Sequence, residues 1–237
     1  MATNYNYTGG IVTNGLVLNL DAAKVDSYPG TGTTWRDISG NNNNGTLTNG
    51  PTFSGIGKQA SIVFDGADDW VTIPAGSTFT YGTGDFTIEC WFRDTSLTST
   101  PYSVLYSQTV SGTNYFLLGV DTVGSNGRVF FIGTLSGGGT PIYASGSYLR
   151  NTWNQVIASR ISGTVTVYLN GVGGTPASNT INFTNTTYIP TIGDESHHGS
   201  SNPWTGNISV VRLYNNKGFT STEVSQNFNA LRGRYGL

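Results

Sequence analysis

The chain has 237 residues, of which 10 % are charged and 33 are glycine, and its formal net charge is −2. Its 11 lysine and arginine residues are scattered singly, so the basic patch of a nucleic-acid-binding protein is missing. No stretch approaches the ~18 apolar residues of a membrane span, and the N-terminal MATNYNYTGG lacks the features of an export signal. A single cysteine, Cys90, excludes an internal disulfide framework and paired Cys/His zinc spacing. We therefore expect one soluble all-β domain with neither nucleic-acid nor membrane partners.

The chain begins with a polar arm and a first strand. Residues 1–14 offer only Ile11 and Val12 for burial, so we expect an arm that docks on a partner rather than a core strand. LVLNL at residues 16–20 is the first strong strand pattern. In WRDISGNNNNGTL at residues 35–47, the Asp, Ser and Asn side chains indicate turns that bond their own main chain, with direct ligand contact as the alternative.

A strand, a turn and a second strand are predicted over residues 61–74, SIVFDGADDWVTIP. Ile62 and Phe64 occupy alternate positions, residues 66–69 have turn composition, and a β-rich run resumes at Trp70 and stops at Pro74. This pattern predicts a tight β-hairpin.

The clearest two-sided strand is DFTIECWF at residues 85–92. Period-two alternation places one set of side chains in the core, namely Phe86, Ile88, Cys90 and Phe92. The other set, which we expect on the outward face, consists of Thr87, Glu89, Trp91 and Arg93.

Further strands are predicted at residues 103–107, 115–120 and 128–132, which gives the spacing of a meander, and a short edge strand is predicted at 142–144. A later strand pair covers residues 151–172, where Asn170-Gly171 is the strongest hairpin signal because both residues readily take the positive φ of a type I′ turn.

The last third of the chain contains two strands, a polar loop and a helix. The strands are expected at residues 189–192 and 208–214, and the loop between them, residues 194–203, holds both histidines. The helix is predicted over residues 221–231. Thr220 and Glu223 fit a capping box, and Val224, Phe228 and Leu231 recur at helical spacing.

Several of these segments, in this order, resemble motifs of laminin-G-like, concanavalin A-like domains. FDGADDWV resembles FDG-x-[DN]-D-[YW]-[VI], residues 35–47 resemble W-x-D-x-S-G-x-x-N-x-G-x-L, and FTIECWF resembles F-T-[IV]-E-x-W-[FV], with further similarity over residues 152–172 and 208–214. The closing strand departs from the pattern, because Ser209-Val210 replaces an Asp-Glu pair. The resemblance implies an all-β, two-sheet antiparallel jelly-roll sandwich over residues 15–237, with a short C-terminal helix at 221–231.

The resemblance also implies where a ligand would bind, since one sheet of such folds is curved and its open face often carries ligands. This points to Glu89, Trp91 and Arg93 as groove residues, with Trp91 stacking on a sugar ring. The structural alternative is that Trp91 is covered by loops and Glu89 pairs with an arginine or a backbone donor. Further carbohydrate-binding candidates come from the loop near the C-terminus, namely Asp194, His197, His198 and Trp204.

Catalysis is disfavoured by the small number of glutamates. Retaining glycosidases need two carboxylates about 5 Å apart, and Glu89, Glu195 and Glu223 lack the E-x-D-x-x-E spacing of the related glucanases. We expect no enzyme activity and no organic cofactor. Calcium is the remaining inorganic candidate, with Asp65, Asp68 and Asp69 as oxygen ligands. The alternative is that these aspartates cap the turn.

The functional prediction is a bacteriophage virion surface protein, either a capsid decoration or a tail-fibre component. Its tail, NFNALRGRYGL, resembles the ends of laminin-G-like proteins of phage virions. The expected partners are other virion proteins and host-surface glycans. A free carbohydrate-binding lectin or accessory module is the alternative, and a glycoside hydrolase is less favoured. Few charges protect the edge strands, so we also expect a homo-oligomer.

Overall fold

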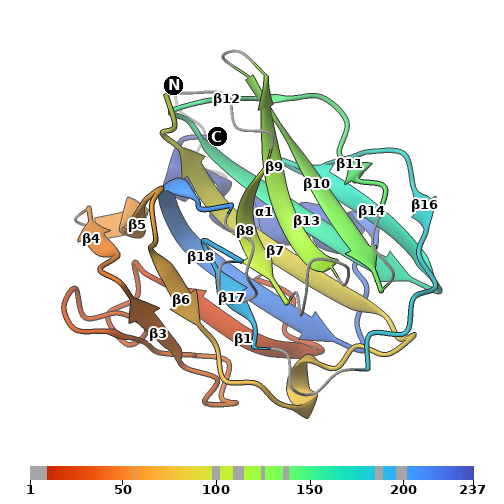
Figure 1. The fold of residues 1–237 in the computed structure, drawn as a ribbon, viewed down its shortest axis with the longest axis horizontal. Helices are drawn as coiled ribbons and strands as arrows, with labels where there is room; N and C mark the ends of the chain where they lie inside the picture. Colours follow the sequence, from red (N-terminus) through yellow and green to blue (C-terminus); the bar gives the residue numbers. More distant parts are fainter. Residues whose placement is uncertain are drawn as a thin grey trace.

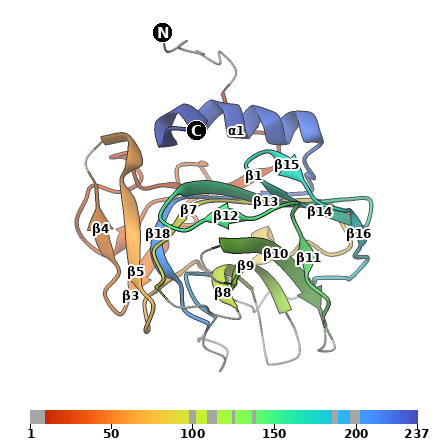
Figure 2. The ribbon, with the colours of Figure 1, turned by 90° about the horizontal axis from the view of Figure 1, so that it is seen from above.

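The computed structural model of the chain describes residues 10–55, 57–97, 102–108, 115–123, 126–135, 139–184, 189–195 and 202–237. These residues form a sandwich of two antiparallel sheets with one α-helix, α1 (Ser221–Tyr235), on its outside (Figure 1). Figure 2 shows three layers, in which α1 lies across the outer face of the first sheet and the second sheet lies on the side of the first sheet away from the helix. Within the described part of the chain, no helix has the length and apolar character needed to cross a membrane.

The first sheet has the strand order β15-β14-β13-β7-β18-β5-β4, with β1 beside β18 and β16 beside β14. Its long central strand β18 pairs through one half with β1 and through the other half with β5. The strands are β1 (Leu16–Asp21), β4 (Thr52–Ser54), β5 (Ser61–Asp65), β7 (Phe86–Asp94), β13 (Trp153–Ile161), β14 (Thr164–Leu169), β15 (Val172–Gly173), β16 (Ala177–Ser178) and β18 (Thr205–Asn215).

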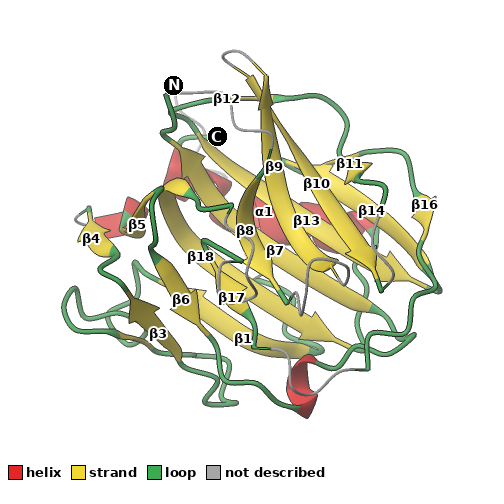
Figure 3. Ribbon diagram, viewed as in Figure 1, coloured by secondary structure: helices red, strands yellow, loops and turns green. Residues whose placement is uncertain are grey.

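The second sheet has the order β11-β10-β9-β8-β17-β6-β3-β2, with β12 beside β10. Neighbours β8, β9 and β10 follow one another in the chain, which confirms the predicted meander (Figure 3). The strands are β2 (Thr34–Trp35), β3 (Gly45–Thr48), β6 (Trp70–Thr72), β8 (Ser103–Ser107), β9 (Tyr115–Val123), β10 (Asn126–Thr134), β11 (Ile142–Tyr143), β12 (Tyr148–Leu149) and β17 (Thr191–Ile192). Short 3₁₀ turns occur at Gly57–Gln59 and Ser77–Phe79.

The hydrophobic core lies between the two sheets and confirms the predicted faces of β7. Phe86, Ile88, Cys90 and Phe92 are all fully buried members of this core. The turn Asn170-Gly171 joins β14 to β15 with positive φ at both residues, as predicted. Alternation and turn chemistry are local properties, so sequence reasoning reaches them reliably.

The predicted hairpin over residues 61–74 is wrong. β5 joins the first sheet, where it pairs with β18 and β4, whereas β6 joins the second sheet, where it pairs with β3 and β17. The intervening turn therefore carries the chain from one sheet to the other. A hairpin within one sheet and a crossover between two sheets require the same alternation of apolar residues. In the structure Phe64 of β5 and Val71 of β6 both enter the core between the sheets, each from its own sheet.

The segment of residues 35–47 is built as a turn. Asp37 accepts hydrogen bonds from the main-chain N–H groups of Asn19, Ser39 and Asn43, and Asn44 Oδ1 accepts one from the Asp37 N–H. These bonds confirm the interpretation of its polar side chains as turn formers.

Helix α1 is four residues longer than predicted. Thr220 and Glu223 form the capping box at its start, and Gly236, in the left-handed conformation, ends it. The extra turn is stabilised by Tyr235, which is buried against Trp91 and Trp153. The described end of the N-terminal arm docks on the same helix, since the Val12 N–H donates to Asn227 Oδ1 at 2.8 Å. This contact lies within the chain, while residues 1–9 lie outside the described residues.

Candidate functional site

The face of the first sheet that carries Glu89 and Trp91 is not an open groove. Helix α1 covers it, and both side chains are 0 % exposed. The Trp91 ring is stacked between Phe228 and Tyr235 of the helix, with centroid distances of 5.9 and 4.3 Å. The prediction that Glu89 and Trp91 line an open groove is therefore wrong in this structure. Aromatic side chains of helix α1 pack on Trp91, where a sugar ring was predicted to stack.

Glu89 is the centre of a buried polar network beneath α1. Its Oε1 accepts hydrogen bonds from Trp91 Nε1, Gln155 Nε2 and Arg212, the last at 3.2 Å. Its Oε2 accepts one from Asn227 Nδ2 of the helix at 2.7 Å. A buried carboxylate is stable only when it is paired and hydrogen-bonded, so Glu89 anchors the helix to the sheet, as the structural alternative expected.

The remaining predicted residues that the structure describes are not gathered into one site. Arg93 is half-buried and its Nε donates to the carbonyl of Asn151. Trp204 is 1 % exposed and belongs to the core, edge-on to Phe92. Asp194 is 1 % exposed, and its Oδ1 accepts hydrogen bonds from the main chain of Glu195 and Asn202. His197 and His198 lie outside the described residues.

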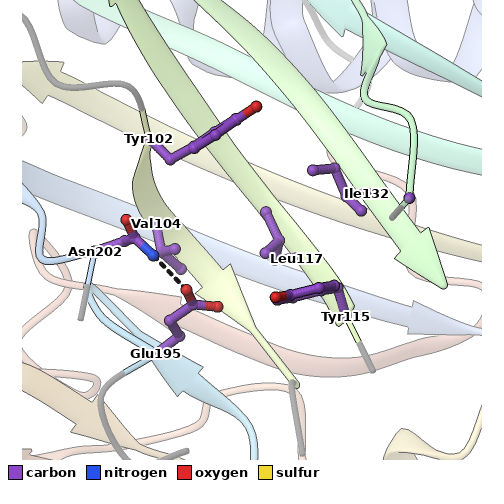
Figure 4. A pocket seen from close by; sticks show the side chains of 8 residues that line it. Tyr102, Val104, Tyr115, Leu117, Ile132, Glu195 and Asn202 are labelled. Carbon is purple, nitrogen blue, oxygen red and sulfur yellow. Dashed lines mark hydrogen bonds between the residues drawn. The ribbon is translucent and has the colours of Figure 1, made fainter. Parts of the chain in front are cut away.

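An open cleft lies on the outer face of the second sheet, the side of the sandwich opposite α1. It has a volume of about 310 Å³, within the range of small-ligand sites. Strands β8, β9 and β10 form its floor, and Figure 4 shows the side chains that line it. Most of the lining is apolar or aromatic, and consists of Tyr102, Val104, Tyr115, Leu117, Gly139 and Ile132.

The polar end of the cleft is formed by Glu195 and Asn202, which flank the loop that follows β17. Asn202 Nδ2 donates to Glu195 Oε1, whereas Oε2 of the same carboxylate is buried and has no hydrogen-bond partner. Burial and the nearby charge of Asp194 raise the pKa of Glu195, while the bond from Asn202 acts in the opposite direction. The cleft therefore combines aromatic walls with one buried acceptor.

An aromatic row extends the floor of the cleft. Phe130 contacts Tyr102 on one side and Tyr143 on the other, with centroids 5.3 and 5.9 Å apart. Beyond it, Arg128 lies over the Tyr143 ring and forms a two-point ion pair with Asp121. The Tyr143 hydroxyl also donates to Asp121, and burial together with this bond raises the pKa of Tyr143 to about 12. In this row Phe130 and Tyr143 lie on the paired strands β10 and β11, and Tyr102 directly precedes β8.

The acidic turn between β5 and β6 brings the three predicted calcium ligands together. Carboxylate oxygens of Asp65, Asp68 and Asp69 lie within 4.8 Å of one another. Two of these carboxylates also cap the turn: Asp69 Oδ2 accepts from the Asp65 N–H, and Asp65 Oδ1 from the Ala67 N–H. Burial raises the pKa of Asp69, with Asp65 and Asp68 adding to that direction. The turn-capping alternative is observed, and calcium binding stays a prediction.

Sequence reasoning missed the aromatic lining of the cleft, although a signal was present. In β9 and β10 the residues that face away from the core include Leu117, Phe130 and Ile132. A sheet face that meets water is normally polar. Apolar residues on both faces of a strand therefore indicate that the outer face is covered or binds a ligand.

Comparison with known proteins gives the family. A model of the concanavalin A-like lectin/glucanases superfamily matches residues 65–225. No curated protein matches the chain significantly. Among solved structures, domain 4 of an extracellular GH43 arabinanase from Geobacillus stearothermophilus, in complex with arabinotriose, is similar at 18 % identity with a TM-score of 0.69, covering 91 % of this chain and 98 % of that one.

Two larger proteins contain a similar fold. The binding domain of Paraclostridial Mosquitocidal Protein 1 matches at 17 % identity with a TM-score of 0.68, over 92 % of this chain and 52 % of that one. A mutant Trypanosoma rangeli sialidase with trans-sialidase activity matches at 17 % identity with a TM-score of 0.67, over 96 % of this chain and 34 % of its own. The present chain thus spans about half or less of these two proteins. Together with the two-sheet architecture, the family match shows that the chain belongs to the concanavalin A-like lectin/glucanases superfamily.

Proposed function

We propose that the chain is a non-catalytic carbohydrate-binding module and that its ligand lies in the cleft on β8, β9 and β10. The observation that carries this proposal is the pairing of exposed aromatic surface with a buried polar end. Tyr102 is 42 % exposed beside the cleft, and Glu195 and Asn202 lie across from it. A sugar ring offers an apolar face for an aromatic side chain and hydroxyl donors for a carboxylate.

The opposite face of the sandwich is a less suitable place for a ligand. Helix α1 and the Glu89 network fill the outer face of the first sheet, so a ligand there would have to displace a buried polar cluster. A glycan-binding role also agrees with the arabinotriose complex of the similar arabinanase domain.

The lining of the cleft supports the absence of catalysis. Among the described residues, Glu195 is the carboxylate that lines it, and a second one is not present in that lining. Hydrolysis with retention or inversion requires a pair of carboxylates that flank the scissile bond. A module that holds a sugar without cleaving it needs only acceptors, donors and a stacking surface.

Glycan binding can be tested by calorimetry with arabinotriose and other neutral trisaccharides. Tyr102→Ala should abolish binding, whereas Tyr102→Phe should keep it, because the ring and not the hydroxyl provides the stacking surface. Val172→Ala, at a side chain that is 59 % exposed on β15, serves as the control and should bind like wild type. Unchanged binding by Tyr102→Ala would place the site elsewhere.

We propose the surface of a bacteriophage virion as the setting of this module, as a capsid decoration or a tail-fibre component among other virion proteins. The support is the resemblance of residues 227–237 to the ends of phage laminin-G-like proteins. Mass spectrometry of purified particles tests this setting. Recovery of the chain only in the soluble fraction would favour the alternative, a free lectin or accessory module. The homo-oligomer stays a prediction, and a monodisperse monomer in light scattering would contradict it.

A further inference from the structure

Glu195 is a buried carboxylate that forms no ion pair among the described residues. It is 2 % exposed, and its Oε2 has no hydrogen-bond partner. The neighbouring Asp194 is 1 % exposed and also has one unpartnered oxygen, Oδ2. The ion pairs found among the described residues engage five other carboxylates, those of Asp21, Glu89, Asp94, Asp121 and Glu223.

The contrast with Glu89 shows what a buried carboxylate needs in this fold. Both oxygens of Glu89 are hydrogen-bonded, and Arg212 supplies the countercharge. Among the described residues, the Glu195 carboxylate accepts a hydrogen bond from the side-chain amide of Asn202 alone, on one oxygen. An unpaired buried charge is strongly unfavourable. A cationic group of a ligand in the cleft would therefore be stabilised by pairing with the Glu195 carboxylate.

The surroundings of the free oxygen favour an organic cation attached to a sugar. Tyr102 and Tyr115 line the same cleft as Glu195 (Figure 4). Aromatic faces attract ammonium groups as well as the apolar face of a sugar ring. A protonated amine also supplies N–H donors. These can bond to Oε2 of Glu195, whose other oxygen, Oε1, already accepts a hydrogen bond from Asn202.

We infer that the cleft selects sugars that carry a free ammonium group, with Glu195 as the residue that recognises it. This inference rests on the proposed carbohydrate-binding function and names the ligand class for the same cleft. The ammonium group donates to Glu195 Oε2, while the ring to which it is attached packs on the aromatic lining. The neighbouring Asp194 adds negative potential, and Asn202 holds the Glu195 side chain in place.

Three trisaccharides of one backbone test the inference. Fully deacetylated chitotriose carries an amine at position 2 of each ring, cellotriose a hydroxyl and N-acetylated chitotriose a neutral amide. At near-neutral pH we expect wild type to bind the amine form about tenfold to a hundredfold more tightly than cellotriose, the range of a charge-assisted hydrogen bond. Equal or weaker binding of the amine form would overturn the inference.

The variant Glu195→Gln isolates the charge, because it keeps the shape and the acceptor oxygen. It should remove the preference for the amine form and leave the affinity for cellotriose within about threefold of wild type. A preference that survives in Glu195→Gln would also overturn the inference. Asp26→Asn, at an exposed carboxylate outside the cleft, controls for general attraction of a cationic sugar to an acidic protein.

The same measurements separate this inference from the proposed function. If arabinotriose or cellotriose binds and the amine form has no advantage, the cleft binds sugars but Glu195 does not select an ammonium group. If no trisaccharide binds to folded wild type, the proposed function fails and the inference fails with it. Thermal melts of each variant establish that the compared proteins are folded.

Discussion

Asn227 is one of the residues that fasten α1 to the sandwich, and its replacement by alanine gives a sharp test of the structure. Its Nδ2 donates to the buried Glu89 Oε2 at 2.7 Å and to the Tyr214 hydroxyl at 3.1 Å, and its Oδ1 accepts from the Val12 N–H. Asn227→Ala leaves the Glu89 oxygen and the Val12 N–H buried without those partners.

The expected loss follows from these contacts. A hydrogen bond to a charged group contributes about 1.5 to 3 kcal/mol, and a buried donor left unsatisfied costs about 1 to 3 kcal/mol. Asn227→Ala should therefore lower the free energy of unfolding by about 3 to 5 kcal/mol. For a chain of this length that corresponds to a fall in Tm of about 6 to 20 °C.

The assay is urea unfolding followed by tryptophan fluorescence, since Trp91 lies directly beneath the helix. Gln226→Ala on the same helix is the control, because its hydrogen bond to the Gly10 carbonyl is exposed, and it should change stability by less than about 0.5 kcal/mol. A loss below about 1 kcal/mol for Asn227→Ala would refute the view that the Glu89 network fastens the helix. Sugar binding should be unchanged in folded Asn227→Ala, because the cleft lies on the other sheet.

Three further outcomes are expected. Gly171→Ala should destabilise the fold by about 1 to 2 kcal/mol in urea, because φ is +83° there and the new Cβ would lie 3.3 Å from Phe228; an unchanged midpoint would contradict this. Burial raises the pKa of Glu195, so its charge destabilises the folded state above the ordinary glutamate pKa, and this penalty vanishes at acidic pH. Glu195→Gln should therefore have a higher Tm than wild type at neutral pH and an equal one at acidic pH; a lower Tm at neutral pH would argue against it. Calcium should raise Tm if the acidic turn binds it, and Asp68→Asn should remove the increase; equal Tm values in calcium and in a chelator would exclude the site.

The candidate site was only partly accessible to sequence reasoning, and β7 illustrates why. Alternation correctly placed Glu89 and Trp91 on the face away from the core. It contains no information about what lies on that face, because the covering helix begins more than a hundred residues later. The same amphipathic helix was predicted from its capping box and spacing, but the sheet that receives it follows only from three-dimensional packing.

The sequence by itself determined the local features of this protein, namely which side chains of each strand face the core, the start of α1 and the turn at Asn170-Gly171. These depend on neighbours a few residues apart. Only the tertiary structure decided that β6 leaves the sheet of β5, that α1 closes one outer face, and that Tyr102 and Glu195 line the same open cleft on the other. These arrangements depend on which surfaces, far apart in the sequence, pack against one another. A strand with a given alternation of apolar residues can pair with several different neighbouring strands, so the alternation alone does not select one.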